Sequence, residues 1–419
     1  MRRVVLLGLV LVVALAASVA SSTAAPTVDG VTARTVTIGG TFPLTGPASL
    51  YATIPSAMKA YFSYINRRKG PDGKRGVNGR QINFIVYDDG YNPANSVQLT
   101  RQLVEQNKVF GVIASLGTEV NEAIRPYLNQ KKVPQLLVST GATTWGVDFK
   151  KYPWTGGWQP PYQFEGALYG QAIARSSPNA KIAVLYQNDS YGKDYIAGLE
   201  AGLGAKKSNI VAKEAHETTA TSVASQMVRL RASGATILVI FSLPGNTVRA
   251  YATATALRWT PAVVYTNSVS GTDTILTLAK TSGASDAILN NTYTTQYPKD
   301  PANPKWDNDA AMKVYKQVMQ TYYPKGRITD GLNYYGVATA EAFVELLAKA
   351  GKNPTRNGLM SQFRNWNQAN PFLLPGNRQK TGGNDQFPVG CDQLVKWTNG
   401  TFRAVQPMRC MKGGEFAVS

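Results

Sequence analysis

Alternating apolar and amphipathic stretches predict strands and helices that follow one another in the same order twice. Residues 36–115 read strand, loop, helix, strand, loop, helix, strand, and residues 181–242 repeat that series. Strand cores such as FGVIAS, IAVLYQ and TILVIF are continuous apolar runs, which is typical of strands buried on both faces. Strands that alternate with helices indicate parallel sheets covered by helices. Two similar α/β units imply a cleft between them.

The pattern after the second copy predicts further elements. We expect a strand over residues 261–267 and a helix over 272–279, followed by two helices at 309–322 and 332–350. Near the end of the chain, FPVGCDQLVKWTNGTFRAV is typical of a hairpin that turns at Asn399 and Gly400.

Irregular stretches interrupt this rhythm and indicate where the chain passes between domains. The 419-residue chain is longer than a single core usually supports. Segments rich in Gly, Pro and polar residues occur at 143–160, at 290–305 and over about the last 45 residues. Three crossings favour an opening hinge. The predicted division is lobe I at 34–156 with 296–372, and lobe II at 157–295 with 373–419.

The first 25 residues have the pattern of a signal peptide. Arg2 and Arg3 precede an apolar run over residues 4–17, and small residues follow, so cleavage after Ala20 or Ala25 is expected. The apolar run is too short to span a bilayer. No cysteine precedes Cys391, so none is placed to carry a lipid. We therefore expect an exported protein of the periplasm or outer cell envelope that is not a lipoprotein.

Cys391 and Cys410 are the cysteines of the chain. In an oxidising compartment they are expected to pair, which would stabilise the fold by about 3 kcal/mol in the chain-entropy model. Two reduced, buried thiols are the alternative.

The charge balance is basic but does not point to nucleic acid. Removing residues 1–25 takes away Arg2 and Arg3 and no acid, so the formal charge falls from +19 to +17. Lys and Arg are scattered apart from the loop at 66–76, and no basic helix carries interleaved aromatic residues. A basic surface with a mild preference for anions is expected, with no nucleic-acid partner.

The sequence offers no convincing catalytic, metal or cofactor site. Asp88 and Asp89 lack a histidine or third carboxylate at ligand spacing, so a structural role is expected. His216 is the only histidine and is expected at the surface without a partner. A phosphate-binding loop, a CxxC pair and an HExxH motif are all missing.

Polar loops after the predicted strands mark the expected ligand site, because ligands of open α/β sheets bind beyond the carboxyl ends of the strands. A Gly-Thr pair at a helix start presents backbone N–H groups suited to a small anion, and SLGT and STGATT would together form such a pocket. Helix capping explains either motif alone better and is an equal alternative for the two together. Tyr51 and Tyr191 fall on opposite lobes and could cover an apolar ligand; ordinary loop packing is the other interpretation. These loops are residues 41–51, 115–118, 139–144, 187–192, 242–246 and 265–271.

From residue 35 onward the chain resembles the periplasmic solute-binding proteins of the branched-chain amino acid type, which are receptors of ABC importers. The resemblance is carried by TGPASLY, YDDGYNP, FGVIASLGT, VPQLLVSTGATTW, KIAVLYQNDSYGKDYIAGL, DPANP and LLPG. It implies two Rossmann-like lobes joined by three crossovers that close on a ligand by hinge motion, a type I periplasmic-binding fold. It also implies a monomer without a cofactor that delivers a small molecule to a membrane permease.

The resemblance also implies ligand-binding residues. The aromatic after the first turn falls on Tyr51, and the lobe II tyrosine falls on Tyr191. Tyr293, near a crossing, is a further candidate. The loops expected to bind a ligand carboxylate fall on Gly117, Thr118, Gly141, Ala142 and Thr143.

One position departs from the family. Amino-acid binders place an acidic residue on lobe II to hold the α-ammonium group, and Asn267 stands there in this chain. A buried ammonium without a counter-charge is costly, so an α-amino acid is disfavoured. Stretches such as PWTGGWQP and LYQND resemble those of receptors for aromatic carboxylates, which suits Trp158, Tyr191 and Tyr293. The expected ligand is a small aromatic or branched carboxylate.

These observations favour ligand capture outside the cytoplasmic membrane without catalysis. A sensor that reports the same ligand to a membrane signalling protein is the alternative. An enzyme such as an amidase is disfavoured because the catalytic groups are missing.

Overall fold

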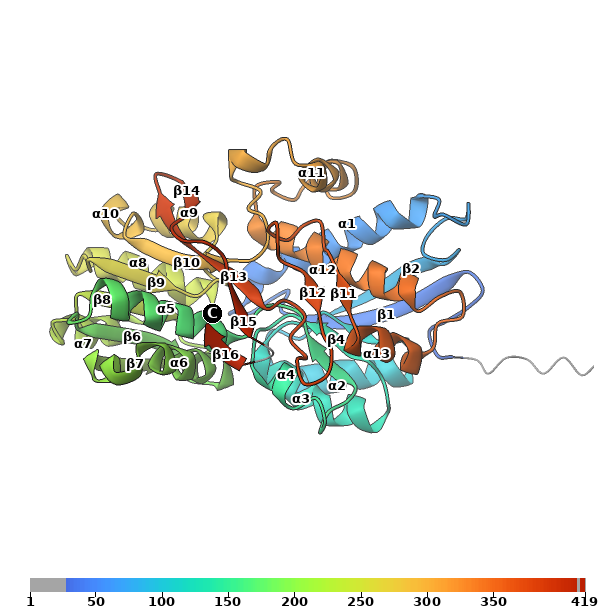
Figure 1. Ribbon diagram of the computed structural model, residues 1–419, viewed down its shortest axis with the longest axis horizontal. Helices are drawn as coiled ribbons and strands as arrows, with labels where there is room; N and C mark the ends of the chain where they lie inside the picture. The colour runs from blue at the N-terminus through green and yellow to red at the C-terminus, as the bar shows by residue number, and fades with distance from the viewer. Residues whose placement is uncertain (1–27, 413–414, 419) are drawn as a thin grey trace, which may run out of the picture.

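Two sheets organise the chain, one wholly parallel and one parallel with antiparallel strands added at one end, and each forms the centre of a lobe (Figure 1). The structure is a computed structural model that describes residues 28–412 and 415–418. Lobe I lies on the right of the figure and lobe II on the left. The predicted α/β class with two Rossmann-like lobes is confirmed.

The sheet of lobe I has the strand order β2-β1-β3-β4-β5, and every neighbouring pair is parallel. Its strands are β1 (Thr35–Phe42), β2 (Gln81–Asp88), β3 (Val112–Ile113), β4 (Gln135–Val138) and β5 (Thr155–Gly157). Its helices, which come from two parts of the chain, are η1 (Ser49–Tyr51), α1 (Thr53–Arg67), α2 (Pro93–Glu105), α3 (Thr118–Gln130), α4 (Thr144–Val147), η3 (Pro304–Trp306), α11 (Ala310–Tyr322), α12 (Gly331–Lys349) and α13 (Arg356–Arg364).

The sheet of lobe II repeats this order as β7-β6-β8-β9-β10 and continues with β13, β15 and β16. Its strands are β6 (Ile182–Gln187), β7 (Ile210–His216), β8 (Ile237–Phe241), β9 (Val263–Thr266), β10 (Thr292–Gln296), β13 (Cys391–Thr398), β14 (Thr401–Ala404), β15 (Arg409–Lys412) and β16 (Glu415–Val418). Its helices are α5 (Tyr162–Ser176), α6 (Ser190–Leu203), η2 (Gly204–Asn209), α7 (Ala224–Ala232), α8 (Pro244–Ala256), α9 (Asp273–Thr281) and α10 (Asp286–Leu289). The repeat seen in the sequence is thus a repeat of topology.

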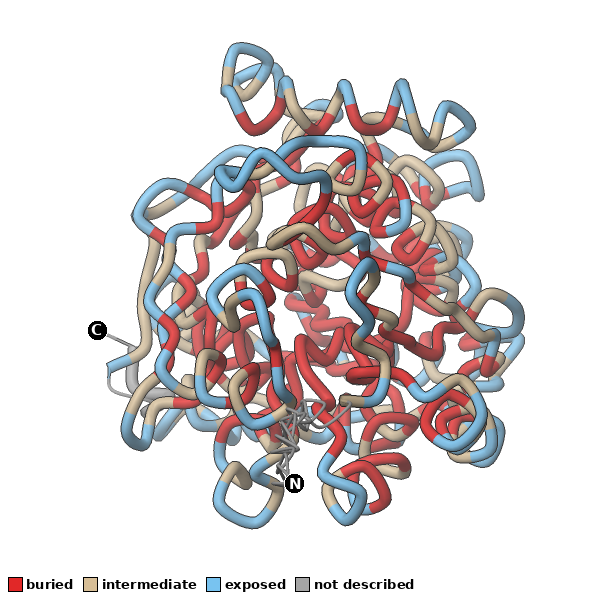
Figure 2. Tube along the Cα trace, turned by 90° about the vertical axis from the view of Figure 1, so that its right-hand side faces the viewer, coloured by how far each residue is buried: buried red, intermediate tan, exposed pale blue. Residues whose placement is uncertain are grey.

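Apolar runs occupy the positions that the pattern predicts. β8 is buried along its whole length because helices cover both faces of the sheet. Figure 2 shows the buried segments in red gathered inside the molecule, with exposed loops in pale blue around them. Polar side chains start several helices by accepting a hydrogen bond from a backbone N–H in the first turn. These N-caps include Asn92, Asp189, Thr272, Asp309 and Asp330.

The expectation of an irregular segment over residues 290–305 was wrong in part, because β10 occupies residues 292–296. β10 pairs in parallel with β9 and antiparallel with β13, so it lies inside the sheet. Thr292, Thr294 and Thr295 are all buried there. Threonine suits a pleated, buried strand, but its polarity hid the strand from a reading based on apolar runs. The irregular crossing begins only after β10.

The chain passes between the lobes after β5, after β10 and before β13. The third passage follows a small two-stranded sheet of β11 (Asn367–Gln368) and β12 (Gln379–Lys380). The exact lobe boundaries stay predictions.

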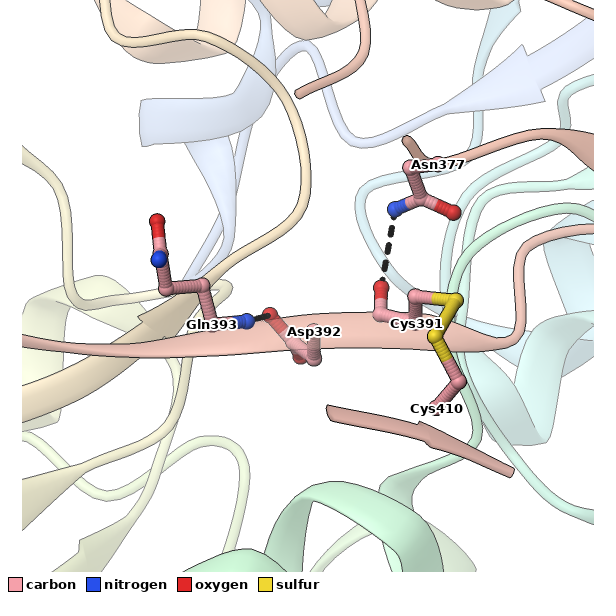
Figure 3. The surroundings of a disulfide bond; sticks show 5 residues. All are labelled: Asn377, Cys391, Asp392, Gln393 and Cys410. Carbon is pink, nitrogen blue, oxygen red and sulfur yellow. Dashed lines mark hydrogen bonds between the residues drawn. A yellow bond between two sulfur atoms is a disulfide. The ribbon is translucent and has the colours of Figure 1, made fainter. Parts of the chain in front are cut away.

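Cys391 and Cys410 form a disulfide that joins β13 to β15 (Figure 3). The predicted pairing is confirmed. The side chain of Asn377 donates a hydrogen bond of 2.9 Å to the carbonyl of Cys391, which ties the preceding loop to the same place. The hairpin turn at Asn399 and Gly400 is also confirmed, with φ angles of 48° and 89°.

The predicted signal peptide at residues 1–25 lies outside the described residues. Within the part of the chain that the structure describes, none of the helices combines the length and apolar character needed to cross a bilayer.

Candidate ligand-binding cleft

A cleft of about 900 Å³, including its open mouth, lies between the lobes. Both lobes and the second crossing contribute to its walls. Aliphatic side chains such as Leu116, Leu243 and Val269 line it together with six tyrosines among the described residues. The tyrosines are Tyr51, Tyr91, Tyr162, Tyr191, Tyr297 and Tyr335. The walls are therefore suited to an apolar or aromatic body.

Burial raises the pKa of each of these six tyrosines, in the case of Tyr335 to about 12. Their hydroxyls therefore stay protonated at neutral pH. A protonated hydroxyl can donate a hydrogen bond, so the aromatic walls can also bind polar groups of a ligand.

Four predicted site residues line the cleft together: Tyr51, Gly117, Thr118 and Tyr191. The hydroxyl of Tyr51 donates a 3.2 Å hydrogen bond to the carbonyl of Val269, so this lobe I side chain reaches lobe II inside the cleft. The two predicted aromatic residues thus face the same space from opposite lobes.

The N-terminus of α3 forms a wall that is suited to binding an anion. Gly117 is its N-cap, with a φ of 109° and no side-chain cap, so the first N–H groups of the helix have no acceptor inside the helix. A Cβ at Gly117 would lie 2.6 Å from the Tyr91 ring, so only glycine lets this ring pack over the helix start. Ser139, which also lines the cleft, has a buried Oγ without a hydrogen-bond partner among the described residues.

Gly141, Ala142 and Thr143 are not among the residues that line the cleft. The carbonyl of Gly141 accepts a 2.7 Å hydrogen bond from the N–H of Tyr162, and the N–H of Thr143 donates 2.8 Å to Asp194 on lobe II. The structure places this loop at the contact between the lobes, behind the cleft wall.

Asn267 lies behind the wall as well, fully buried beneath Tyr191. With the amide oriented to satisfy both ends, Nδ2 donates to the carbonyls of Ile240 (3.0 Å) and Ser242 (3.2 Å), and Oδ1 accepts from the Tyr191 hydroxyl. Asn267 therefore positions a residue that lines the cleft.

Tyr293 and Trp158, the other aromatic candidates, also lie outside the lining. The Tyr293 ring packs against Tyr265 with 5.4 Å between ring centroids. Trp158 is fully buried and supports two tyrosines of the cleft, with its ring centroid 5.4 Å from Tyr335 and 6.0 Å from Tyr297.

A buried carboxylate that sequence reasoning missed supports the lobe II wall. Glu165 on α5 is 1% exposed and accepts hydrogen bonds from the hydroxyls of Tyr169 (2.6 Å), Tyr195 (2.7 Å) and Ser268 (2.7 Å), and from the N–H of Ser268 (2.6 Å). Burial raises the pKa of Glu165, and these donors oppose the increase. Since Ser268 lines the cleft, Glu165 fixes part of its surface. The sequence signal that could have identified Glu165 was a single acid inside the otherwise uncharged stretch QFEGALYG.

Asp88 and Asp89 have the structural role that the sequence predicts. Asp88 accepts from the N–H groups of Leu44 (2.9 Å) and Thr45 (3.2 Å), and Asp89 accepts from the N–H of Tyr91 (2.9 Å). They hold two loops at the strand ends, one of which carries Tyr91 into the cleft.

The expectation that His216 is an exposed residue without a partner was wrong. His216 is 2% exposed, and its Nε2 lies 2.7 Å from the Oγ of Ser242, while Nδ1 lies 3.0 Å from the carbonyl of Glu217. Burial lowers its pKa. His216 ends β7, and the neighbouring strand end covers it, which a sequence cannot show. Neither His216 nor Ser242 lines the cleft.

Two lobes of matching topology with a cleft between them are the architecture of a ligand-binding protein. The family model for periplasmic binding proteins matches residues 35–401, and the chain belongs to that family. It is accordingly a solute-binding receptor and not an enzyme. No significant match exists among curated protein sequences.

Solved structures share the fold of this chain. A branched-chain amino acid ABC transporter protein from Thermus thermophilus with bound valine has a TM-score of 0.75 at 18% identity, over 90% of this chain and 96% of that one. A fatty acid ABC transporter substrate-binding protein from Thermomonospora curvata has a TM-score of 0.73 at 18% identity, over 91% and 93%. A possible leucine/isoleucine/valine-binding protein from Rhodopirellula baltica SH 1 has a TM-score of 0.72 at 18% identity, over 91% and 98%. The type I periplasmic-binding fold expected from the resemblance is confirmed.

Proposed function

We propose that this receptor captures a small carboxylate with an apolar body and delivers it to the membrane permease of an ABC importer. The observation that carries the proposal is the α3 N-terminus at Gly117, which opens into a cleft lined by tyrosines and aliphatic residues. The ligand carboxylate would accept from N–H groups of α3, and its body would pack between Tyr51 and Tyr191. Capture outside the cytoplasmic membrane by a monomer belongs to the same proposal.

The structure constrains the class of ligand less than it constrains the position of the binding site. The similar structures include one described with valine and one described as a fatty acid receptor, so the fold accommodates apolar bodies of different shape. The argument from Asn267 against an α-amino acid has little weight, because that side chain lies behind Tyr191 and the cleft has acidic residues elsewhere. Aromatic and branched carboxylates remain the proposed ligands.

A sensor that presents the same closed, liganded form to a membrane signalling protein is the second candidate. The cleft would be identical in both cases. Reconstitution with candidate permease and kinase partners separates them, because only an importer would drive ATP-dependent uptake of the ligand into vesicles.

A thermal-shift panel on residues 26–419 tests the proposed ligand class. Aromatic carboxylates, branched-chain amino acids, short keto acids, unbranched fatty acids and the matching amides are compared. At a concentration of about 100 times the dissociation constant, a true ligand should stabilise the protein by about 2.7 kcal/mol. We expect acids to raise the unfolding midpoint and the corresponding amides to raise it less. Equal shifts with acids and amides would contradict the carboxylate assignment.

Tyr51 provides a second test, because it joins the lobes inside the cleft. Tyr51→Phe removes the hydrogen bond to Val269 and should weaken ligand binding by about 2- to 10-fold. Tyr51→Ala also removes the ring and should weaken binding by about 30-fold or more. Isothermal titration with the best ligand of the panel measures both.

Tyr87→Phe is the matched control. The Tyr87 hydroxyl donates 3.0 Å to Asn107 in lobe I, and Tyr87 is not a residue of the cleft. Its substitution should leave the affinity unchanged. An affinity that Tyr51→Ala does not alter would place the ligand elsewhere.

A further inference from the structure

The end of the cleft at the second crossing differs from the rest of its surface because acidic groups line it. Asp300 belongs to the segment that follows β10, and Asp273 is the first residue of α9. The N-terminus of α12, at Gly331 and Leu332, completes this end. Neither acid was among the predicted site residues. The ligand contacts proposed above, to the α3 N-terminus and to Tyr51 and Tyr191, also leave this acidic end without a role.

Asp300 is the unusual member of this group. It is 7% exposed, and one carboxylate oxygen, Oδ1, accepts a 2.9 Å hydrogen bond from the N–H of Ala302. The other oxygen, Oδ2, is buried and has no partner at hydrogen-bond geometry among the described residues, although the side chain of Gln296 is a neighbouring donor that acts on this carboxylate. A buried carboxylate oxygen without a donor is costly, and native proteins rarely retain one without a reason.

The nearby cations do not compensate Asp300, because each has another partner. Lys299 also lines the cleft, but its Nζ lies 2.6 Å from Asp309 and 2.8 Å from the carbonyl of Pro371. The guanidinium of Arg327 lies 3.1 Å from Asp273.

The remaining acid at this end is also occupied. Asp330 caps α12 through the N–H of Leu332 (2.9 Å) and accepts from the hydroxyl of Thr274 (3.1 Å). Asp300 and Asp330 thus have no ion pair within the described part of the chain, but of these two only Asp300 has a buried carboxylate oxygen without a hydrogen-bond partner.

The electrostatic state of Asp300 agrees with this geometry. Burial raises its pKa to about 6, and the negative charge of Asp273 adds to the increase, while the N–H of Ala302 and the side chain of Gln296 oppose it. With a pKa in this range, the ionised carboxylate is accessible at neutral pH. An ionised carboxylate of this kind attracts any donor or cation that enters the adjacent space.

We propose that Asp300 is a second recognition point of the cleft, which accepts a hydrogen bond from an amine or hydroxyl that the ligand carries at the end remote from its carboxylate. This inference rests on the proposed function, since it assumes that the α3 N-terminus holds the carboxylate. The chemical class is then an acid with an apolar middle and a donor at its far end.

The surroundings of Asp300 support a donor in preference to a plain hydrocarbon end. Tyr297, Pro298, Pro301 and Leu332 form the walls beside it, and such side chains contribute few competing acceptors. A methyl group placed there would leave Oδ2 unpaired in a drier environment, whereas an ammonium or hydroxyl would complete it. Asp300 also lies on a segment that joins the lobes, so lobe closure can bring ligand and carboxylate together.

The experiment uses matched unbranched carboxylic acids of equal chain length that end in a methyl, hydroxyl or amino group, together with the 2-amino acid of the same length. Isothermal titration at neutral pH measures their affinities for the wild-type protein, for Asp300→Asn and for Asp392→Asn. Asp392 is the control because it is fully buried with an unpartnered Oδ2 but does not line the cleft.

We expect the amino-ended acid to bind the wild-type protein about tenfold or more tightly than the methyl-ended acid, with the hydroxyl-ended acid in between. Asp300→Asn should remove this preference, and Asp392→Asn should retain it. The 2-amino acid should gain nothing over the methyl-ended acid. Thermal unfolding of the empty variants checks the fold, and Asp300→Asn should unfold no earlier than the wild type because it removes an uncompensated charge.

Two failures are distinguishable. If all the acids bind with equal affinity, or if Asp300→Asn keeps the preference, the recognition point is wrong and the carboxylate receptor stands. If none of these acids binds but the aromatic or branched acids of the thermal-shift panel do, this inference fails and the carboxylate receptor stands. If no acid of either set binds, the carboxylate assignment fails, and this inference fails with it.

Discussion

Glu165→Ala should lower the free energy of unfolding by about 3–5 kcal/mol, which is the largest loss of stability that we expect. The substitution removes the acceptor of four hydrogen bonds at a residue that is 1% exposed. The buried hydroxyl of Tyr195 and both donors of the half-buried Ser268 would lose their acceptor. Urea unfolding followed by far-UV circular dichroism measures the change.

The same substitution should weaken ligand binding, because Ser268 lines the cleft and Tyr195 stacks on Tyr162 with 4.3 Å between ring centroids. Glu165→Gln keeps the volume and one acceptor oxygen, so its loss of stability should be smaller. Glu217→Ala, at an exposed position of the same lobe, is the control and should change the stability by less than about 0.5 kcal/mol. Equal stability of the Glu165→Ala and Glu217→Ala proteins would refute the structural role of Glu165.

Loss of the disulfide should have the second large effect. Cys391 and Cys410 are separated by 19 positions, and opening a loop of that size should cost about 3 kcal/mol in the chain-entropy model. The bond fixes β15 against β13, so its loss should first affect the edge of lobe II. Thermal unfolding of the Cys391→Ser/Cys410→Ser double variant measures the effect.

The wild-type protein treated with a reductant should unfold at the same lowered midpoint as the double variant, whose own midpoint should not respond to the reductant. Ligand affinity should change little, because neither cysteine lines the cleft. A midpoint that is unaffected by both treatments would mean that the pairing of β13 with β15 is sufficient without the covalent bond.

The fold was predictable because it depends on local patterns that occur twice. The repeat of strand and helix at residues 36–115 and 181–242 appears in the structure as the matching orders β2-β1-β3 and β7-β6-β8. β10 escaped prediction because its buried residues are threonines, which resemble a polar loop in a sequence. His216 was misplaced because its burial depends on Ser242, a residue of another strand.

The candidate site was less predictable, since several of its residues converge only through the tertiary fold. Gly117 and Tyr191 lie at helix starts and Tyr51 lies in the connection after β1, so the position of the strand ends located them. Tyr297 and Tyr335 reach the cleft from a crossing and from the interior of α12, where no local pattern marks them. The sequence places residues 139–144 in one loop after a strand. It cannot show that Ser139 lines the cleft whereas residues 141–143 do not.

The position of β13 has a consequence for how the chain is made. β10 pairs with β13, and the crossing, η3 and helices α11 to α13 are all synthesised between these two strands. Until residues 391–398 leave the ribosome, a nascent lobe II would present β10 as an open edge, and open edges invite pairing with other chains. Completion of lobe II is therefore a late event in synthesis, set by a strand from the final 30 or so residues.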